Sequence, residues 1–412
     1  MDVDVLVLGA GMVGISTALH LAARGRRVAV VDRSEPGRET SYGNAGFIQR
    51  EAMEPYAFPR SWKKVAQVAL HRGMDVRYHF RALPWLLPNL LRYWSASGTE
   101  NHARAAAHYG TLIARCLDEH EVLIREAGAE DLVRREGYLS VFHHRLAWQR
   151  AVDAAARLHR RHGTLFESID GEKMPGVEPA LSAGLAGAVH WLEPWTVSDP
   201  GGLVERYAAL LQRWGGDVLR GDANTLTRRG GAWIVSCDAG EICAPHVVVA
   251  LGPWSSQLTQ RLGYRLPLFV KRGYHRHYSG GAALRRPVLD VERGFVLSPM
   301  RQGLRLATGA ELALLDSPAT PIQLTHAEIA ARSLTDLGEP VEHTPWLGNR
   351  PCTADMLPIV GPAPRHEGLW FNFGHGHQGF TLGPVTGRLL AELISGEPGF
   401  VASAPFRPDR FP

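Results

Sequence analysis

The stretch VDVLVLGAGMVGISTALHLAARGRRVAVVD, residues 3–32, decides the fold of this chain. It predicts an apolar strand, a glycine turn, a helix and a second strand that ends at Asp32. Gly9, Gly11 and Gly14 form the spacing G-x-G-x-x-G directly after the first strand. The first glycine permits a tight turn, the second lets the backbone approach a pyrophosphate, and the third lets helix and strand pack closely. Because Asp32 stands where an acid can bind a ribose hydroxyl, the stretch predicts a dinucleotide-binding unit and leaves open whether FAD or NAD binds.

The composition is that of a soluble globular chain with two or three domain-sized units. The chain has 412 residues, of which 45% are hydrophobic and 21% are charged. The net charge of +4 is small and its basic residues are scattered, so nucleic-acid binding is not indicated, whereas a small anionic substrate is compatible. The four cysteines form no C-x-x-C pair, which speaks against a zinc site or a disulfide framework. With no signal peptide and no apolar run of transmembrane length, we expect a cytoplasmic protein.

The run LPWLLPNLLRYW, residues 83–94, predicts a helix rich in tryptophan and leucine. Two interpretations are open. We favour an ordinary buried helix, and the alternative is a surface helix that makes peripheral contact with the inner face of a membrane.

Periodicity divides the rest of the chain into α/β and mostly β regions. Residues 108–128 predict one amphipathic helix that ends at a glycine, and residues 201–216 predict another. Residues 246–255 form an apolar strand of the kind that is buried on both faces of a sheet. Residues 265–345 alternate between strands and glycine or proline turns, which predicts an antiparallel sheet. The fold class is therefore α/β, a Rossmann-like domain interleaved with an α+β domain that contains a mostly antiparallel sheet.

Two further segments are rich in glycine and polar residues. TSYGNAGFIQ, residues 40–49, is either a plain surface loop or a loop that lets the backbone approach a flat ring system. In NFGHGHQGFTLGPVTG, residues 372–387, three glycines open a second strand–turn–helix unit. Its two histidines have no third ligand at metal-site spacing, so we predict no metal site.

These motifs together resemble the FAD-dependent D-amino acid oxidase/dehydrogenase family, and most of all its bacterial D-amino acid dehydrogenase branch. The resemblance rests on five segments in this order: the opening fingerprint, the loop of residues 40–49 (called the NAG loop below), VVVALGPWS, RPCTADMLPIVG and GHGHQGFTLGPVTG. It covers nearly the whole chain. It implies a discontinuous FAD-binding domain of residues 1–55, 180–262 and 345–412. Residues 56–179 and 263–344 would then form the substrate-binding domain.

The resemblance also implies positions for non-covalent FAD. The opening turn would hold the pyrophosphate, and the acid after the second strand the adenosine ribose: Gly9, Gly11, Met12, Val13, Gly14, Asp32 and Arg33. The NAG loop would follow the phosphates and the flavin ring: Thr40, Ser41, Asn44, Ala45, Gly46 and Phe47. Adenine would pair with a backbone strand at Ala223 and Asn224, and Ala250, Gly252 and Trp254 would pack near the pyrophosphate. The pyrimidine edge of the flavin would meet His377, Gln378, Gly379, Phe380 and Thr381.

Two residues are predicted to act on the substrate. Arg350 resembles the arginine that binds the substrate carboxylate, a role that a bidentate guanidinium suits. Tyr274 could close the carboxylate pocket with its hydroxyl, in competition with His275, His277 and Tyr278. Cys352 does not occupy the position of the cysteine that attaches flavin in some relatives, which is why we expect FAD without a covalent bond.

The resulting hypothesis is oxidative deamination of a D-amino or cyclic imino acid by hydride transfer to FAD. The alternatives are an FAD-dependent 2-hydroxy acid dehydrogenase of the same fold, an FAD subunit of a larger dehydrogenase complex, and a nicotinamide-dependent dehydrogenase. The electron acceptor remains open among oxygen, a quinone and a partner protein.

Overall fold

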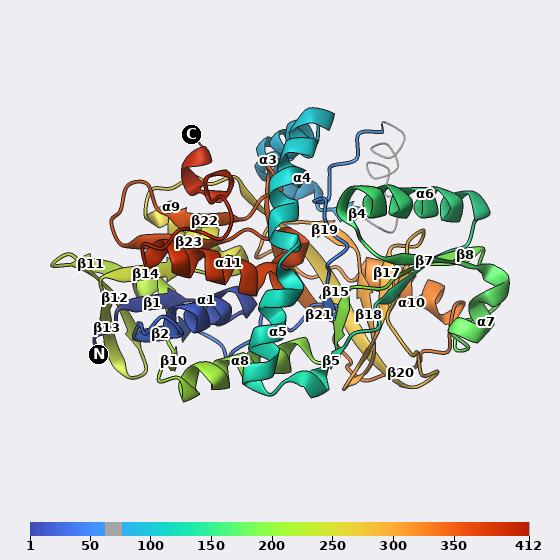
Figure 1. The fold of residues 1–412 in the computed structure, drawn as a ribbon, viewed down its shortest axis with the longest axis horizontal. Coiled ribbons are helices and arrows are strands. Elements are labelled where there is room, and N and C mark those ends of the chain that lie inside the picture. Colours follow the sequence, from blue (N-terminus) through green and yellow to red (C-terminus); the bar gives the residue numbers. More distant parts are fainter. Residues whose placement is uncertain (62–75, 412) are drawn as a thin grey trace.

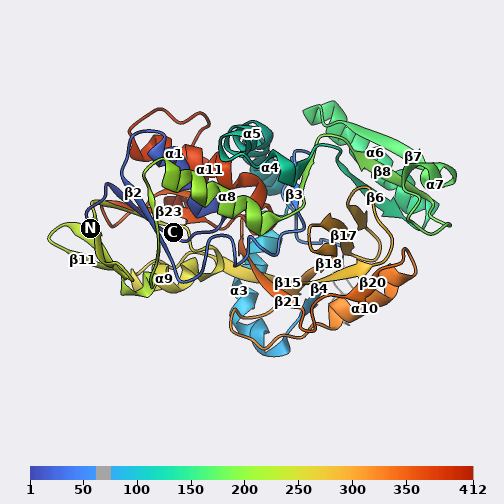
Figure 2. The same cartoon turned by 90° about the horizontal axis from the view of Figure 1, so that it is seen from below.

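The computed structural model describes residues 1–61 and 76–411, and it contains two main sheets that lie side by side (Figures 1 and 2). The first sheet has six strands, and its neighbours are parallel except for the last pair. In spatial order these are β10 (Asp217–Arg220), β2 (Val28–Asp32), β1 (Val5–Leu8), β14 (His246–Val249), β23 (Leu369–Phe373) and β22 (Ile359–Pro362).

The central strands β1 and β14 are apolar runs, as expected where both faces of a parallel sheet are covered. One face packs against α1 (Met12–Ala22), α8 (Pro200–Arg213) and α11 (Gly379–Ile394). The other face packs against β12 (Ala232–Cys237), β13 (Gly240–Ala244) and α9 (Ser255–Arg261), and the exposed β11 (Thr227–Arg229) pairs with the edge of β12. The opening stretch of the sequence thus lies at the centre of a Rossmann-like layer.

The second sheet has eleven strands, and most of its neighbours are antiparallel. Its path is β4 (Val76–Tyr78), β19 (Ala310–Leu312), β15 (Leu268–Gly280), β18 (Gly303–Thr308), β17 (Phe295–Met300), β16 (Val288–Asp290), β6 (Tyr138–Phe142), β8 (Gly187–Trp191) and β7 (Phe166–Asp170). Two further strands, β20 (Gly338–Pro340) and β21 (Trp346–Thr353), pair with β15. Helices α6 (Arg145–His162), α7 (Met174–Val177) and α10 (Ile322–Arg332) pack against it. The predicted fold class is confirmed.

Strand pairing joins segments that we assigned to different domains. β8 pairs with β6 and β7, and β21 pairs with β15, although we assigned both segments to the FAD-binding part. Local composition cannot reveal this, because the partners of a strand lie far away in the sequence. A small sheet of β3 (Phe47–Ile48), β9 (Trp195–Val197) and β5 (Val133–Arg134) brings together segments from both predicted domains.

The helical region over residues 80–127 differs from the prediction in two ways. Where we expected one helix over 108–128, α4 (Thr99–Ile113) ends and α5 (Cys116–Ala127) begins after a two-residue turn. The apolar spacing continues across this turn, so periodicity could not detect it. The region also contains η1 (Phe80–Ala82) and α3 (Leu83–Ala96).

Helix α3 is not the buried helix that we favoured. Trp85, Leu87 and Leu91 expose 72%, 51% and 58% of their surface, and only Leu86 and Tyr93 are buried. The helix lies at the edge of the molecule (Figure 2) and leaves these three apolar side chains exposed. Within the described residues, none of the helices is long and apolar enough to span a bilayer.

Candidate active site

A cavity of about 660 Å³ opens between the two sheets, at the carboxyl ends of the parallel strands. Ligands bind at this edge in open α/β sheets. Its lining comes from the opening glycine turn, the NAG loop, the ends of β2 and β14, the central strands of the large sheet and the turn before α11. The cavity therefore connects the dinucleotide fingerprint with Lys271 and Arg350.

The glycines of the fingerprint are required by the close contacts of the turn. Gly9 has a φ of +112°, and a Cβ there would lie 2.4 Å from the carbonyl oxygen of Ala250. A Cβ on Gly14 would lie 1.8 Å from the carbonyl oxygen of Gly9. Gly11 and Met12 line the cavity where α1 begins, and the positive end of the helix favours a phosphate there.

Asp32 also organises the glycine turn. Its carboxylate accepts hydrogen bonds from the backbone N–H of Ala10 at 2.7 Å and of Ser34 at 2.9 Å, while the residue lines the cavity. Burial raises the pKa of this carboxyl group. The guanidinium of Arg33 lies 4.3 Å from the ring centre of Trp254, and this stacked pair lines the cavity as well.

The predicted adenine contact needs a correction. Ala223 and Asn224 line the cavity, but they lie in a 3-10 turn, η4 (Ala223–Thr225), and not in a strand. The side chain of Asp222 accepts a hydrogen bond from the N–H of Asn224 at 2.8 Å and closes the turn. A polar residue that bonds the backbone two positions ahead favours such a turn over a strand.

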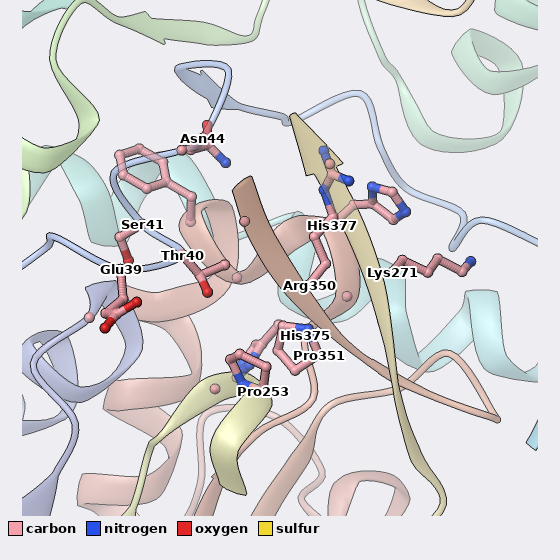
Figure 3. Close-up of a pocket in the computed structure, with 18 of the residues that line it drawn as sticks. Glu39, Thr40, Ser41, Asn44, Pro253, Lys271, Arg350, Pro351, His375 and His377 are labelled. Carbon is pink, nitrogen blue, oxygen red and sulfur yellow. The ribbon is translucent and has the colours of Figure 1, made fainter. Parts of the chain in front are cut away.

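The NAG loop is fixed by hydrogen bonds within the loop and by an arginine of the large sheet. The side-chain oxygen of Asn44 accepts hydrogen bonds from the N–H groups of Gly46 and Phe47 at 2.7 and 3.1 Å. The buried Arg305 on β18 donates to the carbonyl oxygens of Tyr42 and Asn44. Most of the predicted loop residues line the cavity: Thr40, Ser41, Asn44, Ala45 and Phe47 (Figure 3).

Some predicted residues of the turn before α11 line the cavity, and others support its wall through hydrogen bonds. His377, Gly379 and Phe380 line the main cavity. Gln378 does not line it and instead donates to the side-chain oxygen of Gln49 at 2.8 Å. Thr381 accepts a hydrogen bond from the N–H of Gln49 at 3.2 Å, so both residues fix the wall rather than form it.

Arg350 lies at the end of the cavity away from the fingerprint, beside His377 (Figure 3). Its Nη1 donates to the carbonyl oxygens of Arg272 at 3.3 Å and Gly309 at 3.2 Å. Among the residues that the structure describes, no carboxylate pairs with it. Burial lowers the pKa of the guanidinium, which nevertheless stays charged. The arrangement leaves its remaining donors available to an anion.

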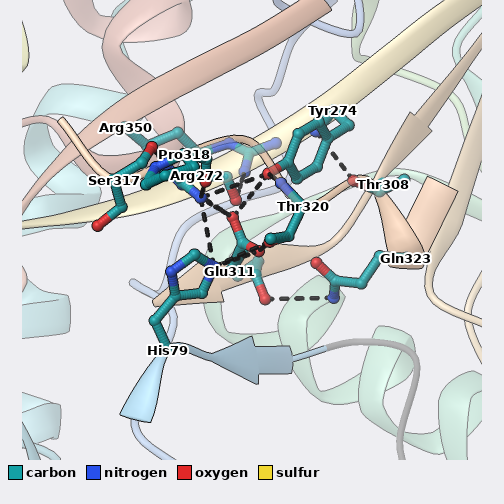
Figure 4. Close-up of polar contacts among 11 residues, drawn as sticks. His79, Arg272, Tyr274, Thr308, Glu311, Ser317, Pro318, Thr320, Gln323 and Arg350 are labelled. Carbon is teal, nitrogen blue, oxygen red and sulfur yellow. Dashed lines mark hydrogen bonds and ion pairs between the residues drawn. The ribbon is translucent and has the colours of Figure 1, made fainter. Parts of the chain in front are cut away.

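Tyr274 borders the cavity, but its hydroxyl is already engaged elsewhere (Figure 4). It donates to the carboxylate of Glu311 at 2.9 Å and accepts from the N–H of Thr320 at 2.7 Å. Side chains alternate along a strand, so Tyr274 projects from the face opposite to Lys271, whose cross-strand partner is Arg350. This geometry argues against the predicted carboxylate contact.

Sequence reasoning missed several residues of the wall. Lys271 is the most informative, because a lysine within the apolar strand LFVKRGYH is itself a signal of function. Aromatic residues from distant segments also line the cavity, and no local pattern groups them: Tyr56, Tyr93, Tyr138 and Trp346. Within residues 1–61 and 76–411, no three His, Cys, Asp or Glu side chains converge as metal ligands would.

The residues present fit FAD. Gly9, Gly11 and Met12 line the cavity beside the N-terminus of α1, and Gly9 and Gly14 allow the close backbone contacts that shape this turn. The same cavity extends to the large sheet, which a dinucleotide with a flavin ring at one end can follow. The fingerprint would hold the pyrophosphate, and the NAG loop with His377 would border the ring.

Comparisons with known proteins agree with this arrangement. The family model described as DAO, FAD dependent oxidoreductase, matches residues 4–393. A D-amino-acid oxidase of Bradyrhizobium diazoefficiens is 32% identical, over 99% of this chain and 98% of the relative. A D-amino acid dehydrogenase of Dechloromonas aromatica is 31% identical, over 96% and 98%. The crystal structure of an iminodiacetate oxidase from Chelativorans sp. BNC1 shares the fold, with a TM-score of 0.73, 22% identity and 98% coverage of each chain. This chain therefore belongs to the DAO family of FAD-dependent oxidoreductases, which decides between FAD and NAD.

Proposed function

We propose that this enzyme oxidises the carbon–nitrogen bond of a D-amino or cyclic imino acid, as the sequence hypothesis states. The observation that carries the proposal is the guanidinium of Arg350 at the end of the cavity opposite the glycine turn, which meets no carboxylate among the described residues. A bidentate guanidinium matches a carboxylate. The names of the relatives, D-amino-acid oxidase and D-amino acid dehydrogenase, support the substrate class.

The residues of the chain bind and orient the substrate. Two backbone carbonyls hold Nη1 of Arg350, so its other donors face the cavity and can fix the substrate carboxylate. When bound, FAD would supply a two-electron acceptor for a hydride from the α-carbon. Water then hydrolyses the imine of a primary amino acid to a 2-oxo acid and ammonia, whereas the cyclic imine of an imino acid keeps its nitrogen. The nearby positive charges of Arg350 and Lys271 favour loss of a proton from the substrate ammonium, which frees the amine lone pair.

The histidines at the site add no charge. Burial lowers the pKa of His375 to about 3, and burial together with Arg350 and Lys271 lowers the pKa of His377 well below its ordinary value. Both rings are therefore neutral at pH 7. Burial also raises the pKa of the Cys352 thiol, which lies 3.7 Å from the carbonyl oxygen of Arg350. A protonated thiol is a poor nucleophile, which supports non-covalent FAD.

Anaerobic reduction of the flavin tests the proposal. We expect D-amino or cyclic imino acids to bleach the flavin of the purified chain. A primary amino acid should release ammonia and a 2-oxo acid, and a cyclic imino acid should give a cyclic imine that retains the nitrogen. Arg350→Met should lower the efficiency of flavin reduction at least about 100-fold, since it removes a charged bidentate contact, while FAD content stays constant. Arg350→Lys restores the charge without the fork and should recover only part of the loss. Unchanged reduction in Arg350→Met would refute the role of Arg350.

Product analysis separates the alternatives. A 2-hydroxy acid would also bind Arg350, but its oxidation releases no ammonia. If the isolated chain binds FAD and no amino, imino or hydroxy acid reduces it, the chain would be a dependent subunit of a larger complex.

The acceptor and the membrane contact need separate measurements. Reoxidation rates of the reduced flavin by oxygen and by a soluble quinone identify the acceptor, and slow rates with both point to a partner protein. We also propose peripheral membrane contact through Trp85, Leu87 and Leu91, because α3 leaves them exposed. Flotation with anionic vesicles should fail for the triple alanine variant if this face makes the contact.

A further inference from the structure

The candidate substrate end of the cavity contains two cationic residues at directly opposed positions of a strand pair. Lys271 on β15 is the register partner of Arg350 on β21 in an antiparallel pair. Directly opposed residues project from the same face with their Cβ atoms about 4.5–5.5 Å apart. Both residues are half-buried and line the main cavity (Figure 3).

Neither cation has an acidic partner within residues 1–61 and 76–411. Lys271 donates to the hydroxyl of Tyr93 at 3.2 Å, and its Nζ lies 4.4 Å from the ring centre of the same tyrosine. An ammonium has three donors, so this contact leaves two. Arg350 likewise uses only Nη1, on two neutral carbonyls.

The neighbouring arginine shows that the fold can pair a cation at this place. Arg272, one residue away on the opposite face of β15, forms an ion pair with the buried Glu311 at 2.6 Å (Figure 4). Each acid that lines the main cavity in the described part of the chain already has a partner at the dinucleotide end. Asp32 accepts backbone N–H groups, Glu39 pairs with Arg33 at 2.9 Å, and Asp222 closes its turn.

Opposed like charges destabilise a sheet, and partly buried cations need an anion. One carboxylate on Arg350 leaves Lys271 unpaired. Both neighbouring histidines are neutral, so within residues 1–61 and 76–411 no other charge at this end offsets the two cations. A ligand with two anionic groups satisfies both cations.

We propose that Lys271 and Arg350 form a two-cation subsite that selects amino or imino acids with a second carboxylate. The α-carboxylate binds Arg350 and the second carboxylate binds Lys271, with the hydroxyl of Tyr93 beside it. This inference rests on the proposed function, because it assumes that Arg350 receives the α-carboxylate of an amino or imino acid.

Matched substrate pairs test the subsite in the holoenzyme. Glutamate against glutamine, and aspartate against asparagine, differ by a carboxylate and a neutral amide of similar shape. Both enantiomers are measured by anaerobic flavin reduction. In the wild type we expect the efficiency for the acid to exceed that for the amide by about 10- to 100-fold, the contribution of a charged hydrogen bond.

Substitutions at Lys271 then assign the preference. Lys271→Met keeps the length and removes the charge, and it should abolish the preference by lowering only the efficiency with the acid. Lys271→Arg should keep most of the preference. The exposed Lys173, outside the cavity, serves as the matched control, and Lys173→Met should change neither substrate.

A binding measurement without turnover completes the test. Glutarate and its half-amide are titrated against the flavin absorbance of each variant, and FAD content reports whether the fold is intact. We expect the Kd of glutarate to rise about 10- to 100-fold in Lys271→Met, with the half-amide little changed.

The outcomes separate this inference from the proposed function. If neutral amino acids reduce the flavin as efficiently as the dicarboxylic ones, the subsite is refuted and the proposed function stands. An equal loss for acid and amide in Lys271→Met would mean that the lysine serves a step common to all substrates, which also overturns the subsite. If no amino or imino acid reduces the flavin, the proposed function itself fails.

Discussion

Among single residues, Gly273 leaves the space that the guanidinium of Arg350 occupies. A Cβ on Gly273 would lie 2.4 Å from Nη1 of Arg350. The guanidinium is the flexible end of a side chain, so it can move away from an added methyl group at little cost in stability. The moved guanidinium would no longer be in position to bind the anion.

Gly273→Ala should therefore weaken substrate binding more than stability. We expect KM to rise about 10-fold or more because displaced donors lose a charged contact, with a small change in Tm. Steady-state kinetics and thermal unfolding measure the two effects. Gly176→Ala is the matched control, because a Cβ there would meet nothing within 4 Å. An unchanged KM in Gly273→Ala would contradict the placement of Arg350.

Glu51 is a buried carboxyl group one layer behind the cavity. One of its oxygens accepts hydrogen bonds from Gln49 at 2.7 Å and from the hydroxyl of Tyr138 at 2.9 Å. Burial raises its pKa from 4.5 to about 7. The folded state therefore holds this proton more tightly than the unfolded state does. The stability that the bound proton contributes is complete below pH 4.5 and is lost as the pH rises through 7, on the order of 3 kcal/mol.

Glu51→Gln removes this ionisation and should change the pH dependence of stability. We expect the variant to gain stability relative to the wild type at pH 8.5, with a much smaller difference at pH 4.5. Thermal unfolding at both values measures the difference, and the exposed Glu339→Gln is the control. An equal effect at the two pH values would show that packing and not charge governs this position.

At the scale of elements, the contact between α1 and α11 places the glycine turn. A Cβ on Gly387 would lie 2.8 Å from the backbone nitrogen of Thr17, and one on Gly383 would lie 2.7 Å from Cγ of Met12. These glycines stand one helical turn apart on α11 and let the two helices approach closely. The helix that starts at the pyrophosphate site is thus positioned by a segment more than 350 residues away in the sequence.

Gly387→Ala should separate the two helices, because the clash is with backbone and cannot be relieved by a rotamer. We expect a loss of about 1–3 kcal/mol in the free energy of unfolding and a weaker hold on FAD. Denaturant unfolding and the FAD content after gel filtration report the two effects. Gly176→Ala again serves as the control, and wild-type stability in Gly387→Ala would contradict the close packing.

Elements also differ in how well the sequence predicts them. The strands and helices of the Rossmann-like layer follow from apolar runs and glycine turns, because each reports a local backbone requirement. The exposure of α3 and the turn between α4 and α5 do not, since the same apolar spacing suits a buried and an uncovered helix. The η4 turn at Ala223 was also not predicted, because it depends on a single hydrogen bond that the side chain of Asp222 accepts from the N–H of Asn224.

For the whole molecule, the cavity lies between the two sheets, so bound FAD links them. Removal of FAD should lower Tm, and added FAD should raise it with concentration. At a hundredfold excess over Kd, bound FAD adds about 2.7 kcal/mol to the free energy of unfolding. Acid precipitation should release all the flavin into the supernatant if it is non-covalent. Flavin that stays in the pellet, or a Tm independent of added FAD, would contradict this expectation.

The sequence by itself determined the nucleotide-binding half of this protein. G-x-G-x-x-G after an apolar strand, and Asp32 after the next, dictate a backbone path that few residues other than glycine permit. The resemblance then singled out Arg350, which the structure places at the cavity. Only the tertiary structure decided what surrounds Arg350. Strand register puts Lys271 opposite it, alternation turns Tyr274 towards Glu311, and neither cation meets an acid within the described residues. Register and pairing join residues far apart in the chain, and therefore no local pattern records them.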